Sequence, residues 1–333
     1  MPWGQIPANS GTLALISQSD HLSERMTEHA HFMGFGISKA MSMGKGTILN
    51  STDYMEYLAE DKETKAIGIY VEGVQDSRQF LGIARVINLT KPIFLWKAGE
   101  AVSAAGDATP DENLSRINQI WENGIHQSGI TRARSLEEMA GAAMAFFNLP
   151  RPRGRRLFIL GGGGGNGVYY ADVCLRFGLQ IPPIKGETLR NIASLIPAVG
   201  SFARNPVDAW KAFHEPEFME KILEAAYSDQ DLDMIVLERL LPRPTFGGPV
   251  NTDTTQPTID YLQKNRLRKP TIVVVDGSGE DPVLAEEAAR IRRLFCGAKI
   301  PAYSSMPEAA KALAHLVSYQ EKINRALRPM PPG

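Results

Sequence analysis

The chain has 333 residues, of which 43% are hydrophobic and 22% charged, as in an ordinary globular protein. Its 36 lysines and arginines balance 37 aspartates and glutamates, so no basic excess points to nucleic acid or to an anionic membrane. No apolar run could span a membrane, and the N-terminus lacks a secretory-signal pattern. Two cysteines fit a reducing compartment and are too few for a zinc cluster. We therefore expect a cytoplasmic protein of two domains without a metal site.

In the first part of the chain, apolar runs alternate with helical stretches. The sequence predicts strands at 12–17, 37–43, 66–71 and 92–96, and helices at 21–33, 52–60, 77–86, 114–127 and 135–148. This alternation is typical of a parallel sheet with helices on both faces. Residues 150–156 are basic and rich in proline and glycine, so they predict a boundary between domains at 1–150 and 151–333.

The second part of the chain repeats this scheme. The sequence predicts strands at 157–160, 234–237 and 271–275, and helices at 168–177, 189–195, 217–227, 258–263, 283–294 and 307–327. In both parts the first strand leads through a small polar or glycine turn into a helix. The sequence therefore predicts two copies of one α/β plan, each with an anion site at its first turn.

The turn at 161–167 reads GGGGGNG between a predicted strand and a predicted helix. Glycine lets the backbone reach positive φ and lets another group come close. The first N–H groups of a helix have no internal partner, and the helix dipole adds positive charge there. We expect phosphate to bind at two sets of residues, which are Gln18 and Ser19 in the first domain and Gly163, Gly164, Gly165, Asn166 and Gly167 in the second.

Two other interpretations of the glycine turn stay open. Gly162, Gly164 and Gly167 have the spacing of a dinucleotide-binding motif, although five consecutive glycines satisfy several such patterns by accident. A nicotinamide site also needs an acidic residue that ends the next strand, and Glu187, at about the right distance, follows no strand pattern. The turn could also be a tight connection that binds no ligand.

Motifs along most of the chain resemble the NDP-forming acyl-CoA synthetase superfamily, which is related to succinyl-CoA synthetase. The similar stretches are ISQS at 16–19, DYMEYLAED at 53–61, IGIYVEG at 67–73, KP at 91–92, KAG at 97–99, the glycine turn with Asp172, NPVD at 205–208, and PAY with PEAAKAL at 301–313. The resemblance implies two flavodoxin-like ligase domains with parallel sheets.

The resemblance also implies parts that this chain does not carry. Members of the superfamily combine the ligase domains with a CoA-binding domain and an ATP-grasp pair. We therefore expect a partner chain to supply the sites for CoA and for ATP or ADP, with phosphate and an organic acid as further ligands. The implied function is that of a subunit of an acid–CoA ligase, and self-association into a homo-oligomer stays open.

In such enzymes a phosphorylated histidine carries the phosphoryl group, and two helices, one from each ligase domain, point their N-termini at it. By position these helices begin at 19–21 and 164–167, and Glu72 matches the carboxylate that orients the histidine. The counterpart of the histidine segment is 109–112, where Pro110 falls on the histidine. Proline cannot accept a phosphoryl group.

A second departure is Asp20, which replaces the glycine of the family's turn. Its charge would repel a phosphate by on the order of 1 kcal/mol, comparable to the favourable dipole term. His21 could replace the missing histidine as acceptor, or it could be an exposed residue of a helix's first turn. Glu72 could be catalytic, or it could be a polar residue that packs at the end of a strand. Asp208 could be catalytic, or its side chain could cap a backbone turn.

Two alternatives to a working ligase subunit follow from these departures. The first is a scaffold or regulatory paralogue without catalysis. The second is a ligase core that transfers phosphoryl or acyl groups without the usual histidine.

Overall fold

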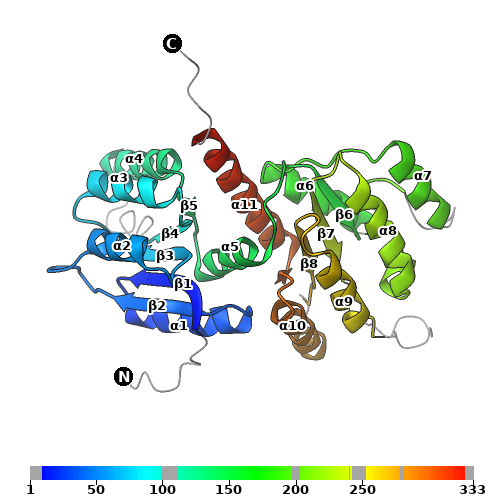
Figure 1. Cartoon of the computed structure of the whole chain (residues 1–333), viewed down its shortest axis with the longest axis horizontal. Coiled ribbons are helices and arrows are strands. Elements are labelled where there is room, and N and C mark those ends of the chain that lie inside the picture. The colour runs from blue at the N-terminus through cyan, green and yellow to red at the C-terminus, as the bar shows by residue number, and fades with distance from the viewer. Residues whose placement is uncertain are drawn as a thin grey trace, which may run out of the picture. The chain divides into compact units, whose positions relative to one another are not determined.

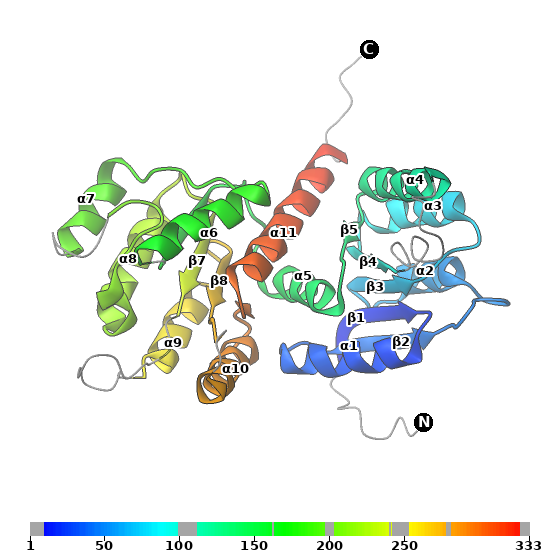
Figure 2. The same cartoon turned by 180° about the vertical axis from the view of Figure 1, so that it is seen from behind.

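The computed structural model, shown from two sides in Figures 1 and 2, describes residues 10–98, 112–161, 163–196, 203–239, 241, 253–277 and 281–326. The chain divides into two compact units, with changes of unit after Ala143 and after Val317. The first unit therefore includes the C-terminal turns of the last helix as well as the N-terminal part of the chain. The ranges 1–150 and 151–333 stay a prediction for the domains.

The first unit contains a five-stranded parallel sheet of order β2-β1-β3-β4-β5. Its strands are β1 (Ser10–Ser17), β2 (Ile37–Ser42), β3 (Ala66–Val71), β4 (Ile93–Lys97) and β5 (Thr131–Arg132). The helices are α1 (Asp20–Phe32), α2 (Ser51–Glu60), α3 (Ser77–Ile87), α4 (Glu112–Ser128) and α5 (Leu136–Asn148). This is the flavodoxin-like order, in which the direction of winding changes between β1 and β3.

Both faces of this sheet are covered. Ile16, Ile67 and Ile69 are almost fully buried in a cluster that α2, α3 and α4 complete. The alternate residues of the strands, such as Leu15 and Gly68, face α1 and α5. Near-continuous apolar strands such as β3 are expected in a parallel sheet because helices cover both of its faces.

The second unit contains a four-stranded parallel sheet of order β6-β7-β8-β9. Its strands are β6 (Leu157–Leu160), β7 (Met234–Glu238), β8 (Thr271–Val274) and β9 (Ala302–Tyr303). The helices are α6 (Gly165–Arg176), α7 (Gly186–Leu195), α8 (Pro216–Ser228), α9 (Thr255–Asn265), α10 (Pro282–Gly297) and α11 (Met306–Ala326), with a short 3₁₀ turn, η3 (Trp210–Phe213). Helix α11 runs through the second change of unit.

The predicted fold class, two flavodoxin-like parallel-sheet α/β domains, is confirmed, and the predicted strands and helices are found with small shifts at their ends. The sequence did not predict β5, β9 or η3. Each of the two missed strands has only two residues, which is too short for a recognisable apolar run.

A lysine holds the end of a helix in the same way in both units. Lys91 precedes Pro92 and β4, and Lys269 precedes Pro270 and β8. Each Nζ donates to two backbone carbonyls at the C-terminal end of an earlier helix, α2 or α8. The acceptors, three residues apart in each unit, are Leu58 and Asp61 for Lys91, and Ala226 and Asp229 for Lys269. The two units thus share this lysine contact with the end of a helix as well as the same general α/β architecture.

Candidate functional site

The strand order of the first unit places a candidate site between β1 and β3. The two connections that leave these strands run to opposite sides of the sheet, and ligands of open α/β sheets bind outside the carboxyl ends of the strands at such a point. The turn from Ser17 to Asp20 follows β1, and Glu72 follows β3. The topology therefore brings the predicted residues Gln18, Ser19 and Glu72 to one edge of the sheet.

The side chain of Gln18 joins the two loops at this edge. Its Oε1 accepts hydrogen bonds from the backbone N–H groups of Glu72, at 2.5 Å, and Gly73, at 3.3 Å. Its Nε2 donates to the carbonyl of Gly73 at 3.1 Å. Gln18 thus positions the backbone next to Glu72. Nothing in the sequence signalled this pairing because the partners are more than fifty residues apart.

Protein oxygens already accept the N–H groups that we expected to bind phosphate in the turn before α1. Ser17 Oγ accepts from the N–H of Ser19 at 3.0 Å, and Ser19 Oγ caps α1 by accepting from Leu22 at 3.3 Å. The exposed Asp20 accepts from the N–H of His21 at 2.8 Å. An anion in this turn would compete with these acceptors and with the charge of Asp20.

Glu72 and His21 have exposed side chains, so both can reach a ligand. His21 is the second residue of α1, beside the carboxylate of Asp20. Burial, together with the charge of Glu72, raises the pKa of the half-buried Tyr70 phenol. The negative charge of Glu72 is therefore felt at the carboxyl end of β3, where the family resemblance implies a role for it.

The glycine turn of the second unit is more accessible to an anion than the turn before α1. Gly164 is the N-cap of α6, with φ of 60° and no side-chain cap, and residues 163–166 are exposed. Uncapped first-turn N–H groups at the positive end of a helix dipole form a ready anion site. At the base of the turn, Gly161 donates its N–H to the carbonyl of Val207 at 2.9 Å.

Asp208 lies beside this glycine turn and gives it a negative charge. Its Oδ2 accepts from the N–H of Gly164, the residue before α6, at 3.2 Å. Asn205 sets the position of this segment: its Oδ1 accepts from Ile159 at 3.0 Å, and its Nδ2 donates to Leu157 at 2.7 Å. These two bonds fix the segment at 205–208 to β6. The contact with Asp208 also occupies the backbone N–H of Gly164, one of the donors of the glycine turn.

The second unit also contains a buried carboxylate that the sequence analysis missed. Glu238 ends β7, is 4% exposed, and accepts a hydrogen bond from the phenol of Tyr170 in α6. Burial and the charge of Glu238 raise the pKa of Tyr170. A Cβ on Gly161 would lie 2.4 Å from the Cβ of Glu238, so this position requires glycine. The sequence pattern that could have revealed Glu238 is an acidic residue at the end of an apolar strand.

Several other expectations can be placed in the structure. Glu187 lies in the first turn of α7 and ends no strand, so the acidic residue of a dinucleotide site is missing there. Among the described residues no group of three or more His, Cys, Asp or Glu side chains could hold a metal ion. No helix in the same part of the chain is long and apolar enough to cross a membrane. Pro110 and Asp111 lie outside the described residues, and α4 begins at Glu112.

These features define a class of protein: a pair of flavodoxin-like domains, each with its first βα turn at the carboxyl edge of a parallel sheet. Residues 10–146 match the family described as succinyl-CoA ligase like flavodoxin domain. The chain is 29% identical to the alpha subunit of the ADP-forming acetate–CoA ligase II of Pyrococcus furiosus, across 95% of this chain and 66% of that relative. It is 26% identical to the ADP-forming 4-hydroxybutyrate–CoA ligase of Nitrosopumilus maritimus, across 95% of this chain and 44% of that relative.

A solved structure gives the same assignment. The dinucleotide forming acetyl-coenzyme A synthetase 1 of Ca. Korarchaeum cryptofilum, in complex with phosphate and ADP, superposes with a TM-score of 0.78 at 25% identity. The match covers 96% of this chain and 68% of that one. The chain therefore belongs to the ADP-forming acyl-CoA synthetase superfamily, as the sequence motifs predicted. It spans two thirds or less of the length of the curated relatives named above.

Proposed function

We propose that this chain is the ligase core of an ADP-forming acid–CoA ligase. The reaction joins an organic acid, CoA and ATP to give an acyl-CoA, ADP and phosphate, and it can run in either direction. The observation that carries the proposal is the likeness to an alpha subunit of such a ligase over 95% of the chain. The uncapped glycine turn before α6 adds a suitable place for a phosphoryl group.

Other parts of the enzyme would supply the remaining sites. We assign the sites for CoA and for ATP or ADP to CoA-binding and ATP-grasp domains, and we place these domains on a partner chain because the relative from Pyrococcus furiosus is the alpha subunit of its enzyme. The complex would work in the cytoplasm, and the ligase core could also self-associate into a homo-oligomer. The residues that we assign to the reaction are Glu72, Asp208 and His21 as catalytic candidates, with Gln18, Ser19 and residues 163–167 around the phosphate.

His21 is the proposed phosphoryl carrier because its imidazole is exposed at the carboxyl edge of the sheet. In that step the bond between the β,γ-bridging oxygen and the terminal phosphorus of ATP breaks, an N–P bond forms, ADP leaves and the imidazole loses its proton. Labelling of the chain from terminally labelled ATP in the complex should vanish in His21→Ala. Labelling that persists in this variant would exclude His21 as the carrier.

The experiment that tests the main proposal begins with native mass spectrometry of the chain purified from its own cells. The complex found there is then assayed for ADP release that requires both the acid and CoA. Acid-dependent ADP release would support the ligase. A complete complex with ATP-grasp and CoA-binding domains that turns over no acid would overturn it.

A specific observation favours a second candidate, a scaffold or regulatory subunit. The N–H groups of Ser19, His21 and Leu22 are already accepted by protein oxygens, and Asp20 places a negative charge in the same turn. Such a turn binds phosphate less well than one with free donors. For this candidate the complex forms in the assay above, and His21→Ala changes neither assembly nor the turnover of its other components.

A further inference from the structure

The glycine turn before α6 has no side chains with which to hold its own shape. Residues 161–165 are all glycine, and glycine has more conformational freedom than any other residue. Gly164, the N-cap of α6, provides no side-chain cap for the helix. The position of the first turn of α6 therefore depends on groups that other segments of the second unit bring beside it.

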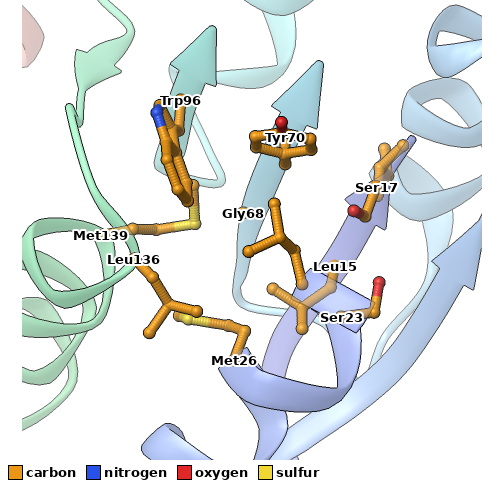
Figure 3. Close-up of a pocket in the computed structure, with 11 residues that line it drawn as sticks. Leu15, Ser17, Ser23, Met26, Gly68, Tyr70, Trp96, Leu136 and Met139 are labelled. Atoms are coloured by element: carbon orange, nitrogen blue, oxygen red, sulfur yellow. The ribbon is translucent and has the colours of Figure 1, made fainter. Parts of the chain in front are cut away.

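The corresponding turn of the first unit is held by its own side chains. Ser17 and Ser23 donate their hydroxyls to the carbonyl of Ser19, at 2.6 and 3.3 Å. Figure 3 shows Ser17 at the end of β1 and Ser23 on α1. The neighbouring side chains that line this part of the interior, such as Leu15 and Met26, are apolar. The second unit uses a different arrangement at the same place in its plan.

In the second unit a buried carboxylate and a tyrosine join α6 to the sheet. The register of β6 and β7 places Glu238 beside Gly161, the first glycine of the turn. Gly161 leaves room for this carboxylate, because a Cβ at Gly161 would lie 2.7 Å from Glu238 Oε2. The other oxygen, Oε1, accepts a hydrogen bond from the phenol of Tyr170 in the second turn of α6. The pair therefore connects the end of β7 to the helix that follows the glycine turn.

The environment keeps this hydrogen bond in place. Glu238 and Tyr170 are 4% and 5% exposed, so water does not compete for the bond. Burial, followed by the charges of Glu238 and Asp276, raises the pKa of Tyr170. The phenol therefore keeps its proton at neutral pH and remains a donor. Hydrogen bonds to a carboxylate are among the stronger ones in proteins, and a low local dielectric strengthens them further.

Stability alone does not explain a carboxylate at this place. Residues 234–237 of β7 are apolar and almost fully buried. An apolar side chain at position 238 would continue this run without the cost of taking a carboxylate out of water. The carboxylate adds a bond of defined direction and length between β7 and α6, which apolar packing does not provide.

We infer that Glu238 and Tyr170 are positioning residues for the phosphoryl site, and that their bond holds the first turn of α6 where its uncapped N–H groups meet the anion. The inference rests on the proposed function for the identity of the anion. Both side chains are buried, so they act through α6 and do not touch the ligand. Asp208 acts on the same turn more directly, through the N–H of Gly164.

The test measures the binding of inorganic phosphate to the full chain by titration calorimetry. Tyr170→Phe removes the donor of the bond and should weaken phosphate binding about fivefold or more. Tyr227→Phe is the matched control, because it removes another buried phenol of the second unit, which pairs with Thr271 at 2.8 Å. This control should leave the affinity for phosphate unchanged. Equal affinities in Tyr170→Phe and the parent chain would overturn the inference.

Variants of Glu238 separate the hydrogen bond from the charge. Glu238→Gln keeps an acceptor for the phenol and removes a negative charge, so phosphate should bind at least as tightly as to the parent chain. Glu238→Leu removes both the acceptor and the charge, and it should bind phosphate about fivefold or more weakly than Glu238→Gln does. A role limited to stability predicts equal affinities in the two folded variants, and that result would contradict the inference. If Glu238→Leu does not fold, Tyr170→Phe carries the test.

A second measurement does not depend on phosphate. The N–H groups of residues 169–172 are among the first in α6 with partners inside the helix. Their amide hydrogen exchange should accelerate about fivefold or more in Tyr170→Phe, relative to the amides of α9 in the same protein. In Tyr227→Phe the exchange of residues 169–172 should stay as in the parent chain.

The outcomes separate this inference from the proposed function. If the parent chain binds no phosphate but Tyr170→Phe accelerates exchange at 169–172, the phosphate site of the proposed function fails and the hold of the pair on α6 stands. If the parent chain binds phosphate and Tyr170→Phe changes neither affinity nor exchange, the phosphate site stands and the positioning inference fails.

Discussion

The side-chain amide of Gln18 holds the backbone of Glu72, whose N–H donates to Gln18 Oε1 at 2.5 Å. Two further bonds tie the same amide to Gly73. The loops after β1 and β3 are thus fixed to each other at the point where the sheet changes its direction of winding. Gln18 resembles part of a phosphate-binding motif, but in this structure its side chain positions the backbone of Glu72.

Gln18→Ala should therefore loosen the loop after β3. We expect a loss of roughly 1–2 kcal/mol of stability, because three partly solvated hydrogen bonds are removed. Amide hydrogen exchange at Glu72 and Gly73 should accelerate with it. Gln75→Ala is the control, because Gln75 donates to Gly46 and leaves these two amides alone. Equal protection of Glu72 and Gly73 in all three proteins would show that Gln18 does not order the loop.

The base of the glycine turn should not tolerate a side chain. Gly161 has φ of 133°, and a Cβ there would lie 2.4 Å from Glu238 Cβ. Gly161→Ala should lower the free energy of unfolding by at least about 2 kcal/mol through strain and steric overlap. Gly165→Ala in the same turn is the control, because a Cβ there meets nothing within 4 Å. Urea denaturation measures both, and equal midpoints would refute this account of the turn.

Removal of the charge at Asp208 should strengthen anion binding at the glycine turn. Asp208→Asn keeps the shape of the side chain but removes a negative charge that contacts the N–H of Gly164. We expect phosphate to bind several-fold more tightly, corresponding to about 1 kcal/mol of lost repulsion at a partly exposed site. Titration calorimetry with phosphate checks this.

The control for Asp208→Asn is Asp172→Asn, which removes an exposed carboxylate of α6 that pairs with Arg176. This change should alter phosphate affinity less. If Asp208→Asn binds phosphate no better than the parent chain, the charge of Asp208 does not act on the turn.

Because of Lys269, the free energy of unfolding should depend on pH in the alkaline range. Burial lowers its pKa to about 8, whereas a lysine in an unfolded chain titrates near about 10.4. Between these values the unfolded chain binds more protons, so stability rises with pH across this window. Below about pH 8 the cost of burying the charged ammonium is fully present. The rise should be on the order of 1 kcal/mol after solvent screening.

Chemical denaturation of Lys269→Met over the same pH range isolates this effect from other titrating groups. The difference in unfolding free energy between parent and variant should change between about pH 8 and pH 10.4. Lys264→Met, which alters an exposed lysine of α9, should show no such change. Parallel curves for the parent chain and Lys269→Met would disprove the assigned pKa.

The two cysteines should be unreactive in the folded chain. Burial raises the pKa of the Cys174 thiol to about 12 and that of Cys296 to about 11, so few thiolates exist at neutral pH. Alkylation by iodoacetamide at about pH 8 should proceed only as the chain unfolds. Modification of either cysteine within seconds under native conditions would contradict the buried positions.

The sequence by itself determined the longer strands, the α-helices and the family. Apolar strands such as 66–71 and glycine at the start of α6 are local signals, because periodicity and turn chemistry act over a few residues. Motifs spread along the chain were sufficient to identify the superfamily. Strands of two residues, such as β9, carry no such signal and form only because a longer strand offers them an edge.

Only the tertiary structure decided how the candidate residues are used. Gln18 faces Glu72 because parallel strands far apart in sequence end at one edge of the sheet. Glu238 is buried against Tyr170, and Gly68 leaves room for the side chains of Leu15 and Met139, because other segments bring these residues beside them. Hydrogen bonds and burial between distant segments depend on three-dimensional neighbours, which no local pattern of residues specifies.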